Sequence, residues 1–86
     1  MSNDIDNCRV CGYNYGEPWG KDGTDPSFEI CLCCGVEFGY GDATLVAVKR
    51  TRGIWLASGT KWVYPKFKPQ DWDVSQQMNQ IPGAWK

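Results

Sequence analysis

Apolar residues alternate with polar residues or glycine in three short stretches of the first half of the chain. The three stretches are Tyr13 to Tyr15, Phe28 to Ile30 and Val36 to Tyr40. A two-residue period is typical of short β-strands. Between the first two stretches, residues 16–26 contain five Gly or Pro residues and read as turns. The pattern predicts a two-stranded ribbon, with Trp19 folding back from the loop onto the core or over a nearby site.

A helical period replaces this alternation after Asp42. We take Asp42 as the N-cap of a helix that opens with residues 43–48 and stops near Ser58 and Gly59. Its inward stripe falls on Leu45, Val48, Arg52, Trp55 and Leu56. A strand over 44–49 is the alternative, because Gly53 and the β-branched residues weaken the helical pattern.

The rest of the chain predicts a short strand and a second, shorter helix. Residues 62–64 (Trp-Val-Tyr) read as the strand, and Asp73 can cap a helix over 74–80 that ends before Pro82 and Gly83. The expected buried residues of this helix are Val74, Met78 and Ile81.

Five cysteines carry the clearest chemistry of the sequence. Cys8 and Cys11 precede Gly12, and Cys31 and Cys34 precede Gly35, so the chain contains two Cys-x-x-Cys-Gly turns. Each turn aims two sulfurs at one point, and four thiolates complete the shell of a tetrahedral zinc or single-iron site. We therefore assign the metal ligands as Cys8, Cys11, Cys31 and Cys34.

Disulfides are the less favoured interpretation of these cysteines. Their number is odd, their spacing is that of metal sites, and the polar start of the chain is unlike a signal peptide. Cys33 is left over, because only Cys34 reproduces the Cys-x-x-Cys-Gly pattern of the first turn. It is either a reactive thiol beside the metal or, as we favour, a small residue in a crowded turn.

Residues 8–15 and 31–36 resemble the two knuckles of rubredoxins, in which four cysteines hold one iron for electron transfer. Zinc ribbons share this knuckle, so the resemblance implies zinc or, alternatively, iron. A longer resemblance runs over Ser27 to Cys34, with Cys11 to Tyr13 and the Trp- and Pro-rich tail. There the chain is similar to the small bacterial cysteine-rich CPCC proteins. That resemblance implies a bacterial, cytoplasmic zinc-binding protein, with an immunity or accessory role beside a toxin system as one expectation.

Together these features predict a small α+β domain in which a knuckle pair on a short β-ribbon precedes one or two helices. One domain covers residues 1–86, with the metal knuckles in 1–42 and the helix and basic, Trp-rich segment in 43–86. A chain this short buries only about 60% of its unfolded surface, and a structural metal can add roughly 10 kcal/mol. The metal is therefore expected to support the fold.

Charge is divided unevenly between these halves. Residues 1–42 contain eight acids and two bases, and residues 43–86 contain seven bases and two acids. The halves therefore carry net charges of −6 and +5. We expect the halves to pack together with their charges paired. The alternative is a basic surface for an acidic partner.

The residue types in the chain argue against an enzyme and favour a binding function. The chain has no His, and a closed shell of four cysteines leaves no open metal position, so we expect no enzyme. A metal-stabilised protein-interaction module is favoured, with Trp72 and Trp85 as candidate exposed contacts. A buried aromatic core is an equally supported interpretation of these two residues.

Two further classes stay open: an iron electron carrier and a nucleic-acid-binding zinc ribbon. Bases and aromatics interleave over residues 61–68, which suits nucleic acid, although the pI of about 5.2 does not. No apolar run approaches the ~18 residues of a membrane span, and we expect a cytoplasmic protein.

Overall fold

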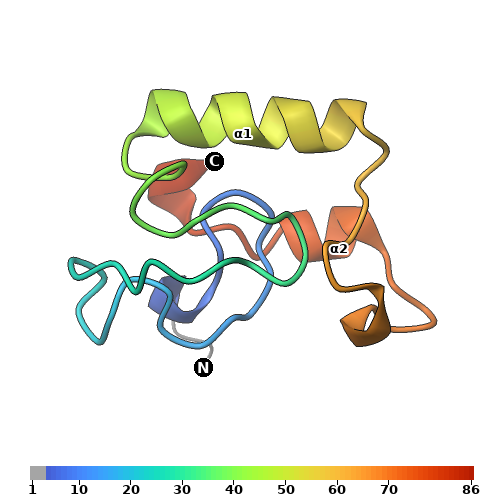
Figure 1. The fold of residues 1–86 in the computed structure, drawn as a ribbon, viewed down its shortest axis with the longest axis horizontal. Coiled ribbons are helices and arrows are strands. Elements are labelled where there is room, and N and C mark those ends of the chain that lie inside the picture. The colour runs from blue at the N-terminus through green and yellow to red at the C-terminus, as the bar shows by residue number, and fades with distance from the viewer. Residues whose placement is uncertain (1–3) are drawn as a thin grey trace.

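Short helical elements joined by long irregular segments make up residues 4–86, the part of the chain that the computed structural model describes. The elements are, in chain order, η1 (Asp4–Asp6), α1 (Leu45–Ala57), η2 (Pro65–Phe67), α2 (Val74–Met78) and η3 (Gly83–Trp85). Helix α1 lies along one side of the molecule, above the irregular first half (Figure 1). Within residues 4–86, no helix is both long enough and apolar enough to cross a membrane.

Within residues 4–86, two isolated β-bridges form in place of the predicted two-stranded ribbon. They pair Asn7 with Asn14 and Ile30 with Glu37, so each bridge closes one Cys-x-x-Cys turn on itself. We call residues 7–14 the first knuckle and residues 30–37 the second knuckle. Past the first bridge, the amides of Tyr15 and Gly16 both donate to the carbonyl of Asp6, which ends the pairing. The ribbon prediction is therefore wrong.

Residues 62–64, predicted as a strand, also form no regular strand. They run beside the second knuckle, where the amides of Val63 and Tyr64 donate to the carbonyls of Cys33 and Leu32 at 3.0 and 3.1 Å. An alternating strand would place Trp62 and Tyr64 on the same face, but Trp62 is buried and Tyr64 is 45% exposed.

The start of α1 differs from the prediction. Its N-cap is Thr44, whose hydroxyl accepts from the Ala47 amide at 3.1 Å, and not Asp42. Asp42 is fully buried and accepts from the Trp19 indole at 2.8 Å and the Gly39 amide at 2.7 Å. Because these two loop donors occupy the carboxylate, Asp42 closes the preceding loop and Thr44 takes over the capping role.

Both predicted helices form, but the predicted inward stripe of α1 is wrong at Leu45 and Leu56, which are 41% and 43% exposed. Helix α1 ends at the predicted place, with Ser58 as C-cap and Gly59 at a φ of +94°, and the strand alternative for 44–49 is wrong. Its buried side chains are Val48 and Trp55. Asp73 caps α2 as predicted by accepting from the amides of the next turn, although α2 ends at Met78 and not at residue 80.

Aromatic rings link the two halves of the chain. Tyr13 packs edge-on against Trp62 at 5.5 Å, Trp62 against Trp72 at 5.5 Å, and Trp72 against Trp55 at 6.4 Å between ring centroids. Trp72 and Trp85 are half-buried. Their predicted role as exposed contacts is therefore wrong, because the fold uses both rings as packing surfaces.

Candidate metal centre

The two knuckles have the same backbone geometry. In each, the glycine amide donates to the carbonyl of the first cysteine, Gly12 to Cys8 at 3.0 Å and Gly35 to Cys31 at 3.1 Å. Both glycines have a left-handed backbone, with φ of +85° and +83°. Such a φ is accessible to glycine without the steric cost that a Cβ imposes. The Cys-x-x-Cys-Gly sequence thus determines a turn that brings both of its sulfurs to one side.

Four sulfurs, from Cys8, Cys11, Cys31 and Cys34, lie within 4.8 Å of one another. The cross-knuckle pairs, Cys8 with Cys34 and Cys11 with Cys31, are each 3.7 Å apart. Four sulfurs at about 2.3 Å from a central zinc ion would be about 3.8 Å apart along each edge of the tetrahedron. The four cysteines are therefore positioned to bind one metal ion.

This sulfur cluster lies at the centre of the core. Cys8, Cys11 and Cys31 are fully buried and belong to the same cluster as Val10 and Phe38. Burial raises the pKa of the Cys11 thiol, and the hydrogen bond with Cys11 lowers the pKa of Cys31. Without a cation, the buried sulfurs therefore have to share protons. A divalent ion would displace those protons and neutralise part of the thiolate charge.

Cys33 is buried but lies outside the group of four. Its sulfur accepts a hydrogen bond from the side-chain amide of Gln77 at 3.3 Å, and the same amide nitrogen donates to the Cys11 carbonyl at 3.2 Å. The Gln77 carbonyl oxygen accepts from the Trp72 indole at 2.8 Å. One side chain of α2 thus connects the two knuckles to the aromatic series.

Helix α2 also touches the first knuckle at Gly12. A Cβ at this position would lie 2.1 Å from the backbone oxygen of Gln77, far inside van der Waals contact. The second knuckle has a similar contact, because a Cβ on Gly35 would lie 2.5 Å from a methyl carbon of Val63. At each knuckle glycine, a segment of the second half of the chain therefore packs closely against the backbone, in the space that a Cβ would occupy.

Arg52 connects α1 to the first knuckle. Its guanidinium donates to the carbonyls of Val10 at 2.7 Å, Arg9 at 2.8 Å and Trp85 at 2.6 Å. Burial lowers the pKa of Arg52, and the negative charge of Cys8 opposes this shift. The helical period places Arg52 on the inward stripe of α1, but the sequence prediction gave it no role at the site. A charged residue on an apolar stripe is the signal that could have indicated one.

Replacing Arg52 with methionine is expected to lower the free energy of unfolding of the metal-loaded protein by about 2 kcal/mol, because three carbonyls lose a charged donor. Methionine retains much of the aliphatic stem. Arg50→Met is the matched control, since Arg50 is an exposed residue of the same helix. Urea unfolding of both variants measures the difference, and equal losses would mean that the contacts of Arg52 add nothing.

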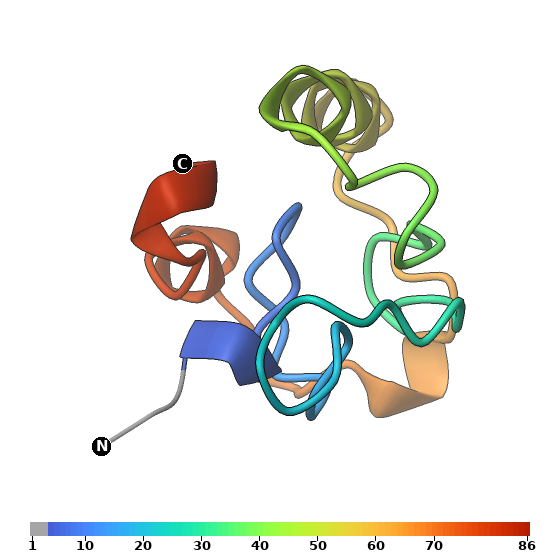
Figure 2. The same ribbon diagram turned by 90° about the vertical axis from the view of Figure 1, so that its left-hand side faces the viewer.

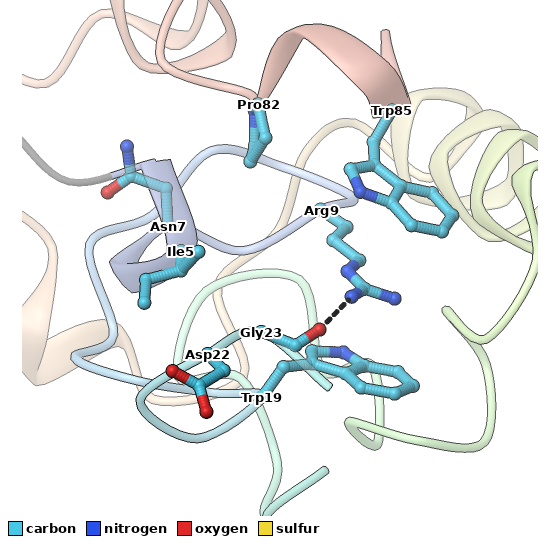
Figure 3. A pocket seen from close by; sticks show the side chains of 8 residues that line it. All are labelled: Ile5, Asn7, Arg9, Trp19, Asp22, Gly23, Pro82 and Trp85. Atoms are coloured by element: carbon cyan, nitrogen blue, oxygen red, sulfur yellow. Dashed lines mark hydrogen bonds between the residues drawn. The ribbon is translucent and has the colours of Figure 1, made fainter. Parts of the chain in front are cut away.

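A second arginine lies beside the site, at the edge of a small cavity (Figure 3). The Arg9 guanidinium carbon is 3.8 Å from the Trp19 ring centroid and 4.0 Å from the Trp85 ring centroid. It donates to the carbonyls of Gly23 at 3.0 Å and Asp42 at 3.2 Å. Cation–π contacts with both rings thus join the first knuckle, the loop after it and the C-terminal segment. Trp19 folds back as predicted, onto Arg9 and Asp42.

Comparison with known proteins shows a relative in Bacillus. The chain is 31% identical to the uncharacterised protein YoaQ of Bacillus subtilis (strain 168), in an alignment that covers 74% of this chain and 68% of that protein. No protein-family profile matches the sequence. No solved structure matches it either.

Proposed function

This chain belongs to the family of the uncharacterised Bacillus subtilis protein YoaQ, and we propose that it is a small protein-interaction module built on a structural zinc centre. The observation that carries the proposal is the closed group of four sulfurs, of which Cys8, Cys11 and Cys31 are fully buried. A complete protein shell leaves no position for a substrate or a water molecule, as is typical of structural zinc. The proposal therefore assigns no catalysis to the site.

Interaction is the part of this proposal that the surface supports. Ten large apolar residues of the described chain are at least 40% exposed, several of them beside one another in sequence. Exposed apolar side chains that adjoin one another are candidates for contact with a partner. The expected link to a bacterial toxin system rests on the sequence resemblance to CPCC proteins alone.

The metal content tests the structural centre. We expect the purified protein to be colourless and to contain one zinc ion per chain by elemental analysis. We expect X-ray absorption at the zinc edge to show four sulfur neighbours at about 2.3 Å. A coloured protein loaded with iron would instead favour the electron-carrier alternative, because ferric thiolate centres absorb visible light. Zinc with nitrogen or oxygen neighbours would contradict the assignment of the four cysteines.

A further inference from the structure

An exposed basic and aromatic surface lies directly on the second knuckle. Its apolar residues are Val63, Tyr64 and Phe67, which are 47%, 45% and 47% exposed. Its bases are the exposed residues Lys61, Lys66 and Lys68. We call these six residues the knuckle patch.

The second knuckle, which carries two of the four cysteine ligands, positions the backbone of the knuckle patch. The amides of Val63 and Tyr64 donate to carbonyls of the second knuckle, and the Val63 side chain packs where Gly35 lacks a Cβ. Trp62, between the patch and the core, is only 7% exposed and packs on Tyr13 and Trp72. The shape of the patch therefore depends on the closed knuckle.

The apolar side chains of the patch are preorganised. The Tyr64 and Phe67 rings meet edge to face, with centroids 6.4 Å apart and an interplanar angle of 78°. Pro65 begins the short helix η2 between them, which limits the backbone freedom of this turn. Because these rings are already ordered, little side-chain conformational entropy is lost when a partner binds them.

The charge of the patch selects the partner. Residues 60–70 contain three lysines and no acid, in a chain whose net charge is −1. A partner segment with carboxylates around apolar side chains would complement both features. The lysine positions also weigh against stacked nucleic-acid bases. The Lys66 ammonium lies 5.3 Å from the Phe67 ring centroid and the Lys68 ammonium 5.2 Å from that of Trp72, over the faces that bases would need.

We propose that the knuckle patch is the docking site for an acidic, apolar-containing segment of a partner protein. The inference rests on the proposed interaction function and adds its surface and the chemistry of its ligand. Lysines provide steering and carboxylate contacts, while Val63, Tyr64 and the part of Phe67 that Lys66 leaves open provide the apolar area.

A synthetic peptide that alternates glutamate with leucine and phenylalanine serves as the probe for the zinc-loaded protein. We expect its amide shift changes, followed by NMR of the protein, to centre on residues 61–68. The double variant Lys66→Glu/Lys68→Glu should weaken binding at least about tenfold. The matched control Lys49→Glu/Arg50→Glu makes the same charge change on exposed residues of α1 and should change affinity less than about twofold.

Three results would overturn the inference. They are equal losses in both double variants, shift changes centred elsewhere, and a thymidine oligonucleotide that binds the patch more tightly than the peptide. Zinc content and near-ultraviolet circular dichroism of each variant show whether its fold is intact. A protein with zinc and an intact fold that ignores the peptide refutes the docking site but not the structural centre. A protein that folds without metal refutes the structural centre itself.

Discussion

Replacing Cys34 with serine is expected to unfold the chain, and removing the metal with a chelator should have the same effect. Structural zinc contributes roughly 10 kcal/mol to folding, whereas a domain of this size has a net stability of about 5 to 10 kcal/mol. Here the sulfurs are part of the core itself, in the cluster that includes Phe38, Val48 and Trp55. Loss of the ion therefore leaves unligated, buried thiols in the middle of this core.

Circular dichroism and NMR measure this effect directly. The near-ultraviolet signal of the packed tryptophans should disappear, and the amide resonances should collapse into a narrow range. Cys33→Ser is the matched control, because Cys33 is buried beside the site but lies outside the group of four sulfurs. It should keep one metal ion per chain and a dispersed spectrum. A well-folded metal-free protein would contradict the structural role of the site.

Replacing Gly12 with alanine is expected to lower the free energy of unfolding by about 2 to 5 kcal/mol. A left-handed backbone costs an alanine roughly 1 to 2 kcal/mol, and the φ of Gly12 is +85°. The remainder comes from α2, because the new Cβ would lie 2.1 Å from the Gln77 carbonyl oxygen. Overpacking of this kind costs about 1 to 3 kcal/mol. Urea unfolding of the metal-loaded protein measures the sum.

Alanine substitutions at two further glycines separate the cost of the backbone conformation from the cost of the clash with α2. Gly16 has a φ of +89°, but a Cβ at this position would find no atom within 4 Å, so Gly16→Ala should show the backbone cost alone. Gly53 lies inside α1 in open space, and Gly53→Ala should stabilise the protein by about 0.5 to 1 kcal/mol. If Gly12→Ala costs no more than Gly16→Ala, then α2 does not rest on the first knuckle.

Features of the structure that depend on a few neighbouring residues could be predicted from the sequence. The Cys-x-x-Cys-Gly turns, the Asp73 cap of α2 and the stop of α1 at Gly59 each follow from local backbone chemistry. The grouping of Cys34, rather than Cys33, with the other three sulfurs also agrees with the glycine that follows it. Each of these features is determined by residues within a few positions of one another in the sequence.

The incorrect predictions arose where a residue has a distant competitor. Asp42 is a good cap by its sequence neighbours, yet the Trp19 indole, 23 positions away, takes its carboxylate. The ribbon prediction was wrong because an alternating pattern does not determine which stretch pairs with which. In the structure, each knuckle forms its β-bridge within itself. Arg52 and Gln77 contact the knuckles across 42 and 66 positions. The charged position on the apolar stripe of α1 is a sequence signal for Arg52, but it does not indicate which distant carbonyls the side chain contacts.

The residues that cover the first knuckle come from 77–85, far along the chain from the knuckle itself. Asn7 donates to the carbonyl of Gln80, Gln77 reaches Cys11, and the ring of Trp85 lies on Arg9. Figure 2 shows the C-terminal elements beside the first knuckle. All four sulfurs leave the ribosome long before this cover does. A nascent chain that ends before Trp72 therefore has all four ligands but lacks the segment that covers the first knuckle.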